Sequence, residues 1–255
     1  MPLDDGQGAR AAGARLSVCM ATWNGGRFLR EQLGSILPQL GPSDELVLSD
    51  DRSSDDTLAV ARSFGDPRLR IVEGPAARSA PLNFENALRH ATGDLLTLSD
   101  QDDVWLPGRV ALIRERLEAR RGGLHLLALD ARVTDEAGRV TDPSLFAKLR
   151  AGPGLLKNVY ANTYVGCCLA FTRPLLELAL PFPARIPMHD MWLGLLAELH
   201  GTAEFVPVPL LDYRRHAGNA TTFEIEFRPV TQLRRRANLA WNLARRSLER
   251  RKALT

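Results

Sequence analysis

Short apolar segments alternate with amphipathic helical segments over residues 16–130, and this alternation constrains the fold more than any other feature of the chain. Each apolar segment ends at a polar or glycine-rich turn, after which a pattern with helical periodicity begins. Strands that alternate with helices form a mostly parallel central sheet with helices on both faces, an α/β fold. Strands are predicted over residues 16–21, 45–49, 69–72, 95–99 and 124–130, and helices over 28–37, 57–64, 82–90 and 107–121.

The pattern loosens after residue 135 into loops with glycine and proline, followed by a predicted strand over 164–171, a helix over 188–200 and a strand over 204–208. No linker-like segment and no internal repeat divides the chain, which predicts one domain over residues 14–227. Residues 1–13 contain small residues and two aspartates but no apolar core of a secretory signal. They are predicted to be a flexible leader of a cytoplasmic protein.

The composition excludes several classes of protein. Hydrophobic residues at 45% and charged residues at 25% are ordinary for a globular chain and exclude collagen-like and disordered classes. No apolar run approaches the roughly 18 residues that cross a bilayer. Cys19, Cys167 and Cys168 lie inside apolar runs without metal-binding spacing, and we expect buried thiols without chemistry.

The positive charge is concentrated at the end of the chain. Residues 228–255 contain nine Lys and Arg and one Glu, a net charge of +8. Because the whole chain carries only +3, residues 1–227 have a net negative charge. A nucleic-acid partner is therefore not expected. Helical spacing predicts a basic amphipathic tail helix with an apolar face of Leu233, Ala237, Trp241, Ala244 and Leu248. Two interpretations stay open, namely peripheral contact with an anionic membrane and packing against the domain or a second copy.

Carboxylates cluster directly after predicted strands. In a parallel sheet, ligands bind beyond the carboxyl ends of the strands, where Thr22–Asn24, Asp50–Asp51 and Asp100–Asp103 are expected to meet. Asp100 and Asp102 are two residues apart on one turn, and such carboxylates suit Mg²⁺ or Mn²⁺ bound together with a diphosphate. The alternative is a set of solvated acidic turns that cap the following helices.

Three segments together carry a family resemblance. The sequences LSVCMATWNGGRFLREQL, ELVLSDDRSSDDT and NFENALRHATGDLLTLSDQDDVW resemble the nucleotide-binding half of family 2 glycosyltransferases, which have the GT-A fold. This half covers residues 14–110, which leaves 111–227 as the acceptor half. The segments MHDMWLGLLAELHG and LDYRRHAGNAT resemble bacterial rhamnosyltransferases.

The resemblance implies a metal-dependent, inverting glycosyltransferase of bacterial cell-surface polysaccharide synthesis. The donor would be a nucleoside diphosphate sugar, with dTDP-rhamnose as the first expectation and a UDP-sugar as the second. The acceptor would be a hydroxyl of a glycan or a lipid-linked saccharide. Such an enzyme would act in the cytoplasm, with the basic tail as a means of contact with the inner face of the membrane.

The resemblance also implies roles for individual residues. Thr22 and Trp23 match the segment that packs against a pyrimidine base, and Asp51 matches the acid that accepts from its N3–H. Asn83 falls where a further polar group of the donor site lies, and Asp100 matches the residue that reaches the ribose.

The remaining matches concern the metal, the diphosphate and the reaction. Asp102 matches the metal ligand, and His216 is a candidate to complete the metal shell of Mg²⁺ or Mn²⁺. Arg214 belongs to a loop that would cover the diphosphate, where a cation offsets the charge of the leaving group. Asp190 matches the catalytic base that takes the proton of the acceptor hydroxyl.

One residue departs from the family pattern. Arg52 stands after the second acid of the base-binding turn, where the family usually has glycine. If this turn requires a positive φ, we expect Arg52 to strain it.

Two alternatives come from other functional classes. Residues 100–104 after an apolar strand resemble the nucleophile motif of haloacid-dehalogenase-like phosphatases, although that motif normally opens the domain and here three strands precede it. The second alternative is a nucleotide-sugar-binding scaffold without turnover, which the presence of Asp51, Asp102 and Asp190 disfavours.

Overall fold

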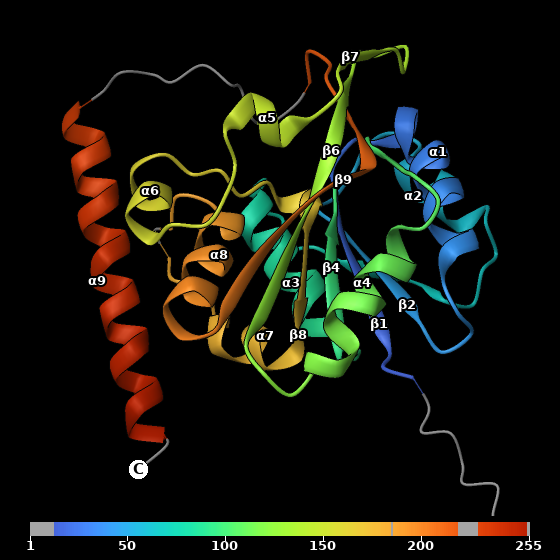
Figure 1. Ribbon diagram of the computed structural model, residues 1–255. Coiled ribbons are helices and arrows are strands. Elements are labelled where there is room, and N and C mark those ends of the chain that lie inside the picture. Colours follow the sequence, from blue (N-terminus) through green and yellow to red (C-terminus); the bar gives the residue numbers. More distant parts are fainter. Residues whose placement is uncertain (1–12, 185, 219–228, 254–255) are drawn as a thin grey trace, which may run out of the picture.

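The structure is a computed structural model that describes residues 13–184, 186–218 and 229–253 (Figure 1). The predicted leader therefore lies outside the described residues except for Gly13, and so do residues 228, 254 and 255 of the predicted tail. Within the described ranges one continuous sheet has nine strands in the order β3-β2-β1-β4-β8-β6-β9-β5, with β7 paired to β6. The strands are β1 (Leu16–Thr22), β2 (Glu45–Asp50), β3 (Leu69–Glu73), β4 (Leu95–Ser99), β5 (Val104–Trp105), β6 (His125–Thr134), β7 (Val140–Asp142), β8 (Leu169–Thr172) and β9 (Thr202–Arg214).

The sheet is mostly parallel, as predicted. Strands β1 to β4 pair in parallel, and β6 pairs in parallel with β9. Strand β8 lies between β4 and β6 and runs antiparallel to both. The strands β1 to β4 therefore run in the same direction as β6 and β9. The helices are α1 (Gly26–Ile36), α2 (Thr57–Arg62), α3 (Ala80–His90), α4 (Arg109–Leu117), α5 (Leu145–Leu149), α6 (Leu155–Tyr160), α7 (Arg173–Ala179), α8 (His189–His200) and α9 (Pro229–Ala253).

Helices cover both faces of the sheet because the strand side chains alternate between two apolar cores. Val18 and Met20 of β1 belong to the core that α1 and α4 cover, whereas Cys19 between them belongs to the core under α3, α7 and α8. All three cysteines are free and buried, as expected. Figure 1 shows α1 and α2 on one side of the sheet and α8 and α9 on the other.

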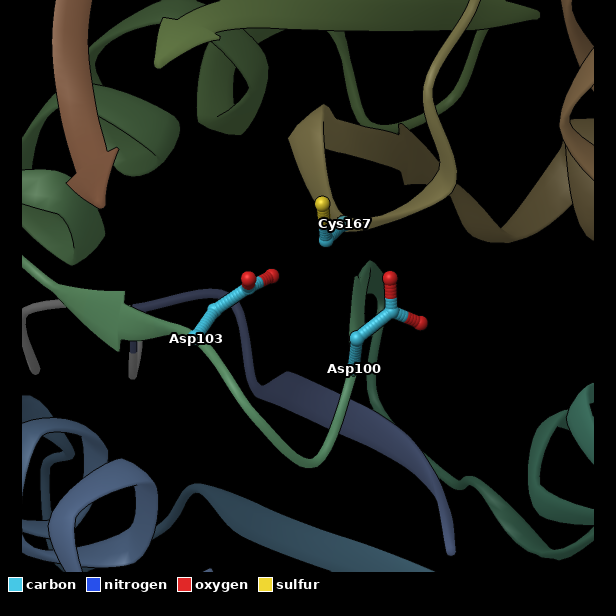
Figure 2. Close-up of side chains that lie close together, drawn as sticks. All are labelled: Asp100, Asp103 and Cys167. Carbon is cyan, nitrogen blue, oxygen red and sulfur yellow. The ribbon is translucent and has the colours of Figure 1, made fainter. Parts of the chain in front are cut away.

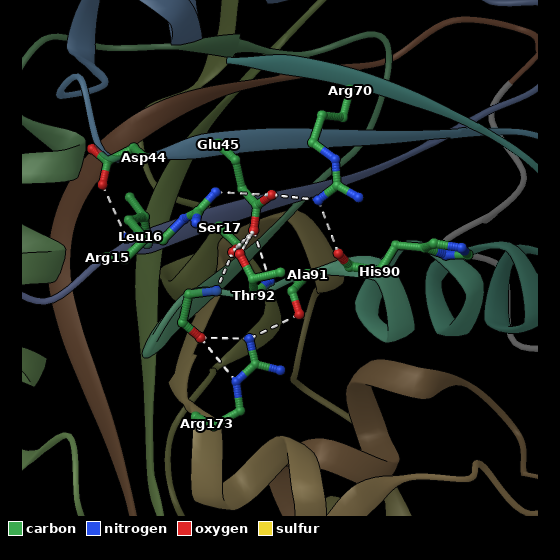
Figure 3. Close-up of polar contacts among 11 residues, drawn as sticks. Arg15, Leu16, Ser17, Asp44, Glu45, Arg70, His90, Ala91, Thr92 and Arg173 are labelled. Atoms are coloured by element: carbon green, nitrogen blue, oxygen red, sulfur yellow. Dashed lines mark hydrogen bonds and ion pairs between the residues drawn. The ribbon is translucent and has the colours of Figure 1, made fainter. Parts of the chain in front are cut away.

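The amino-terminal ends of β1 and β2 are held by a buried carboxylate, Glu45 (Figure 3). Its Oε1 accepts from Ser17 Oγ and from the backbone N–H of Thr92, both at 2.7 Å, and its Oε2 accepts from Arg70 at 2.7 Å. Burial by itself would raise the pKa of Glu45, but these hydrogen bonds lower it to about 2. The charged groups at this end of the sheet are thus paired with one another.

Two strands differ from the sequence prediction. The segment predicted as one strand over 164–171 is a 3₁₀ turn over Gly166–Cys168 followed by the short β8. A buried apolar run has the same composition in either conformation, so periodicity does not separate them. Strand β9 is longer than the predicted 204–208, because register shifts opposite Asp130 accommodate Pro207 and Pro209.

The predicted tail helix is confirmed as α9, and its predicted apolar face is not the side that packs on the domain. Leu239 and Leu243 are the buried leucines, whereas Trp241 and Leu248 of the predicted apolar face are exposed. The side chain of Leu233 lies outside the described residues. The helix therefore packs on the domain through a second apolar pair.

Two helical glycines provide a test of how closely α8 packs against Tyr164. A Cβ at Gly194 of α8 would lie 2.3 Å from the ring of Tyr164, whereas a Cβ at Gly34 of α1 would meet nothing within 4 Å. We expect Gly194→Ala to lower the free energy of unfolding by about 1–3 kcal/mol. Gly34→Ala should raise it by about 0.5–1 kcal/mol, because alanine loses less entropy in a helix. Urea unfolding of both variants measures this, and equal effects of the two substitutions would contradict the packing described for α8.

Candidate active site

The carboxyl ends of β1 and β2 lie side by side, with Thr22 opposite Asp50. The backbone N–H of Asp51 donates to the carbonyl of Thr22 at 2.9 Å, and Thr22 Oγ1 donates to Asp50 Oδ1 at 2.9 Å. Asp51 is buried, and its Oδ1 accepts from the backbone N–H of Ala77 at 3.2 Å. Its Oδ2 is buried and has no hydrogen-bond partner among the described residues. A buried acceptor of this kind calls for a donor, which a ligand N–H can provide.

Asn83 and Trp23 lie beside this turn. Asn83 of α3 donates from Nδ2 to the carbonyl of Thr22 at 3.1 Å, and its Oδ1 accepts from Ser49 Oγ at 2.6 Å. Gln101 holds the backbone of Trp23, accepting from its N–H at 2.9 Å and donating to its carbonyl at 3.1 Å. The structure thus brings these predicted residues to one edge of the sheet, while their contacts with a nucleotide stay predictions.

The backbone of Arg52 has a φ of 60°, so the condition for strain stated from the sequence is met. The left-handed region costs a residue with a Cβ roughly 1–2 kcal/mol. The Arg52 side chain is exposed and lies 3.5 Å from the carboxylate of Glu73. The turn that presents Asp51 therefore holds a strained residue.

The turn between β4 and β5 carries three aspartates. Asp100 and Asp103 converge with the thiol of Cys167, with one atom of each within 4.8 Å of the others (Figure 2). Burial, together with the charges of Asp102 and Asp190, raises the pKa of Asp100 to about 7. Burial and the neighbouring Asp102 and Asp100 raise the pKa of Asp103 well above its usual range. Carboxylates that disfavour one another's charge in this way are stabilised by a cation.

Asp102 contacts the loop after β9. His216 Nε2 lies 2.8 Å from Asp102 Oδ2, and His216 Nδ1 accepts from the backbone N–H of Gly218 at 3.1 Å. Since Nδ1 accepts, the neutral imidazole carries its proton on Nε2 and donates it to Asp102. The ring of Phe28 packs on the imidazole with 4.7 Å between centroids. Asp102 and His216, predicted as metal ligands from positions far apart in the sequence, are thus in contact.

Arg214, at the end of β9, is buried and anchors the acidic turn. Its backbone N–H donates to Asp103 Oδ1 at 3.0 Å, and its Nε donates to the carbonyl of Asp102 at 3.0 Å. The guanidinium also donates to the carbonyl of Glu136 at 3.2 Å and pairs with the carboxylate of Glu31. The sequence implied a contact of Arg214 with the donor diphosphate, and this contact stays a prediction.

The donor set of the turn fits a hard divalent cation. Asp100, Asp102 and Asp103 offer carboxylate oxygens, and Asp103 Oδ2 is buried without a hydrogen bond from the described residues. Oxygen ligands suit Mg²⁺ and Mn²⁺, whereas a thiol suits softer metals. A hydrogen bond with Cys168, together with burial, raises the pKa of the Cys167 thiol well above its usual range, so it stays protonated. The carboxylates, with His216 beside them, are therefore the candidate metal ligands.

Asp190 lies in the first turn of α8 and is buried. Its Oδ1 accepts from the backbone N–H of Met191 at 2.5 Å and from Asn162 Nδ2 at 3.3 Å. Burial raises the pKa of Asp190 to about 6, and these hydrogen bonds oppose the increase. The charge of Asp190 contributes to the raised pKa of Asp100, which places the two carboxyls in one electrostatic environment. A carboxylate with a pKa near neutrality suits a general base.

The turn over Gly166–Cys168 connects the acidic turn with Asp190. Cys167 lies beside Asp100 and Asp103, and the backbone of Gly166 contributes to lowering the pKa of Asp190. His189 packs on the same turn, because a Cβ at Gly166 would lie 2.9 Å from His189 Nε2. Burial lowers the pKa of His189 to about 3, and its ring stacks on Phe84 with 4.4 Å between centroids. His189 is therefore a neutral packing residue.

Four further residues lie at the site without a role of their own predicted from the sequence, namely Gln101, Asp103, Cys167 and Arg109. Arg109 is fully buried, donates to the carbonyl of Cys167 at 2.5 Å and lies over the ring of Trp105 at 4.8 Å. Asp103 was part of the acidic run, which is the one signal that pointed to it. The other residues meet the site through contacts between distant segments, for which no local pattern exists.

Comparison with known proteins identifies the family. The sequence model of glycosyl transferase family 2 matches residues 17–177, and the chain belongs to this family. It is 30% identical to EpsE of Bacillus subtilis over 150 residues, which are 54% of this chain and 53% of EpsE. It is 25% identical to the dTDP-rhamnosyl transferase RfbG of Shigella flexneri, covering 82% of this chain and 75% of RfbG. A shorter match, 28% identical over 38% of each chain, is to the Escherichia coli WfgD, named UDP-Glc:alpha-D-GlcNAc-diphosphoundecaprenol beta-1,3-glucosyltransferase.

Solved structures confirm the GT-A fold. The structure of S. aureus TarS 1-349 in complex with UDP-GlcNAc superposes with a TM-score of 0.64 at 19% identity, over 83% of this chain and 61% of that one. Glucosyl-3-phosphoglycerate synthase from Mycobacterium tuberculosis, in complex with Mn²⁺, UDP and glucosyl-3-phosphoglycerate, gives a TM-score of 0.56 at 24% identity, over 92% and 80%. The chain thus spans about half the length of EpsE and 61% of that TarS chain.

The strained turn at Arg52 leads to a stability prediction. We expect Arg52→Gly to be more stable than Arg52→Ala by about 1 kcal/mol, because glycine adopts a positive φ without steric cost. Both variants lose the ion pair with Glu73 equally, so alanine is the matched control. Thermal and urea unfolding compare the two. A more stable alanine variant would show that the backbone at this position is not strained.

Proposed function

We propose that this protein is an inverting, metal-dependent glycosyltransferase that moves a sugar from a nucleoside diphosphate donor to an acceptor hydroxyl. The observation that carries the proposal is the arrangement of three kinds of acidic group around one edge of the sheet. Asp51 presents a buried oxygen without a partner, the turn at Asp100–Asp103 crowds carboxylates, and Asp190 is a buried carboxyl with a raised pKa. Asp51 suits an acceptor of a hydrogen bond from the nucleobase. The turn at Asp100–Asp103 suits a site for a metal ion and a diphosphate, and Asp190 suits a general base.

The nucleotide is proposed to bind across the ends of β1 and β2. Asp51 would accept a hydrogen bond from the N3–H of a pyrimidine, with Thr22, Trp23 and Asn83 around the base and Asp100 at the ribose. The similarity to RfbG supports dTDP-rhamnose as the first donor candidate. The UDP-GlcNAc and UDP complexes of the structural neighbours support a UDP-sugar as the second.

The proposed cation is Mg²⁺ or Mn²⁺, and a Mn²⁺-bound structural neighbour supports this class of metal. Asp102, Asp100 and Asp103 would hold it, with His216 completing the shell once its Nε2 proton is displaced. When bound, the cation supplies charge stabilisation for the departing diphosphate. Arg214 would hold the acidic turn in place and add positive potential close to the same phosphates.

Asp190 is proposed to take the proton of the acceptor hydroxyl. The acceptor oxygen forms a bond with the anomeric carbon while the bond to the nucleoside diphosphate breaks on the opposite face, which inverts the configuration. A single base suffices for one displacement, whereas a retaining glycosidase needs two carboxylates about 5 Å apart on either side of the sugar. The hydroxyl and Asp190 need to come within hydrogen-bond distance for this step.

The proposed acceptor is a glycan or a lipid-linked saccharide of bacterial cell-surface polysaccharide. The name of WfgD, which describes transfer to a diphosphoundecaprenol-linked sugar, supports a lipid-linked acceptor. The proposed place of action is the cytoplasm at the inner face of the membrane, with the basic tail helix in peripheral contact. Among the helices that the structure describes, none combines the length and apolarity of a membrane span.

The two alternatives from the sequence are separated by turnover and nucleotide binding. Membership of glycosyl transferase family 2 favours the transferase over the phosphatase. A scaffold would bind the nucleotide sugar without consuming it, whereas the proposed enzyme would transfer the sugar to an acceptor hydroxyl and release the nucleoside diphosphate.

Calorimetric titration of dTDP and UDP, with and without Mn²⁺, tests the donor site. We expect Mn²⁺-dependent binding, and Asp102→Ala should weaken it by about tenfold or more, because a metal-holding carboxylate is lost. Asp51→Ala should weaken dTDP binding while leaving inorganic diphosphate binding unchanged. Glu115→Gln, an exposed acid of α4, is the matched control and should bind as the wild type does. Binding of neither nucleotide, or binding indifferent to Mn²⁺, would overturn the proposed donor site.

The pH dependence of sugar transfer tests Asp190 as the general base. Asp190 acts when deprotonated, so kcat/KM should rise with pH through about 6 and level off above it. Asn162 lowers the pKa of Asp190 by donating to it, so Asn162→Ala should move the acid limb to higher pH. Asp190→Asn should lower kcat by about 10²-fold or more. A profile whose acid limb is unmoved in Asn162→Ala would assign that limb to another group.

A further inference from the structure

Helix α9 packs on the domain through a narrow inner face. Leu239 and Leu243 are buried in the core shared with α7 and α8. Arg246, one turn further on, is also buried, and its guanidinium donates to the carbonyls of Leu178, Leu180 and Pro181. The helix thus has a fixed orientation relative to the domain, and Figure 1 shows it along one side of the molecule.

The opposite side of α9 carries a second apolar stripe. Ala237, Trp241, Ala244 and Leu248 follow helical spacing and are all exposed, with Trp241 at 69% and Leu248 at 58%. At about 100° per residue this stripe lies roughly opposite Leu239 and Leu243. A tryptophan and a leucine on the outside of one helix form an apolar surface that the domain does not cover.

Cations border this stripe. The exposed residues that flank it on α9 are Arg234, Arg245, Arg251 and Lys252. Glu249 is the one acid between residues 228 and 255, and it lies near Arg245 and Arg246 at 3.4 Å. We call the stripe and these four cations the outer face of α9. It combines apolar side chains with a strongly positive rim.

Helix α6 lies beside α9. Arg236 of α9 donates to the carbonyl of Tyr160 at 2.9 Å, and its guanidinium lies 4.4 Å from the centre of the Tyr160 ring. Tyr160 and Leu156 of α6 are both largely exposed. Helix α6 thus also carries exposed aromatic and leucine side chains.

We propose that the outer face of α9 docks on an anionic lipid bilayer. Trp241 and Leu248 would enter the boundary between headgroups and acyl chains, and the arginines would contact lipid phosphates, which is the arrangement that suits an interfacial helix. A second copy is a poorer occupant, because two outer faces would bring four cations of one helix against four of the other. The charge of the face thus selects a negatively charged partner with an apolar interior.

This inference deepens the proposed function and takes its biological meaning from it. A lipid-linked saccharide remains at the membrane surface, so a docked enzyme searches for it in two dimensions rather than three. The proposed binding of vesicles, however, depends on the outer face of α9 and is measured without donor, metal or acceptor.

Sedimentation of the full-length protein with vesicles tests the inference. One set of vesicles is phosphatidylcholine alone, and the other is an equal mixture of phosphatidylcholine and phosphatidylglycerol. We expect binding to the anionic set that high salt releases, with blue-shifted tryptophan fluorescence. The double variant Trp241→Ser/Leu248→Ser, and separately Arg234→Glu/Arg251→Glu, should each weaken binding by about tenfold or more.

The control is Val140→Ser/Val208→Ser, which removes two exposed apolar side chains outside α9 and should bind vesicles as the wild type does. Nucleotide titration of the same variants separates the two proposals, because the α9 variants should keep wild-type affinity for the donor nucleotide. Equal binding to both vesicle sets, or equal binding by the α9 variants, would overturn the docking surface. So would a concentration-dependent dimer, seen by sedimentation velocity, that the Trp241→Ser/Leu248→Ser variant loses.

Discussion

The geometry of the candidate site depends on one buried arginine. Arg214 binds the acidic turn after β4 by two hydrogen bonds, to a carboxylate of Asp103 and to the carbonyl of Asp102, across more than a hundred residues of sequence. Like charges crowded on a short turn repel one another, and a fixed cation at the base of the turn offsets this. Strand β5 strengthens the same link, because it pairs antiparallel with β9 just before Arg214. The last strand of the sheet thus completes a site that begins on the first four.

The same crowding explains why the carboxyls of this site do not titrate like exposed aspartates. Asp100 and Asp190 lie on different elements, yet burial raises the pKa of both toward neutrality, and the charges of Asp102 and Asp190 add to the effect on Asp100. A cation bound at the turn would reverse the effect on Asp100 and favour its charged form. Binding of the proposed cation at this turn would therefore change the charge state of the carboxyls around it.

Much of the fold and part of the site follow from the sequence for a simple geometric reason. Parallel strands end at the same edge, so Thr22, Asp51 and Asp100 had to meet once the strands were recognised. The contacts that complete the site have no such local signature. The turn over Gly166–Cys168 looked like a continuing strand, and nothing in the sequence indicated that Arg109 would hold its carbonyl. Pairings between segments far apart in the chain are decided by packing, which a single sequence does not reveal.

Helix α9 shows the limit of periodicity as a guide to orientation. The sequence predicted an apolar face that includes Trp241 and left open whether this face contacts a membrane, the domain or a second copy. The domain instead buries Leu239 and Leu243, and Arg246 on the same side of α9 donates to the carbonyls of Leu178, Leu180 and Pro181. The side of the helix that faces inward thus carries a buried arginine together with two leucines. The apolar stripe with Trp241 and Leu248 is exposed to water and flanked by cations. Exposure of a tryptophan and a leucine to water is unfavourable.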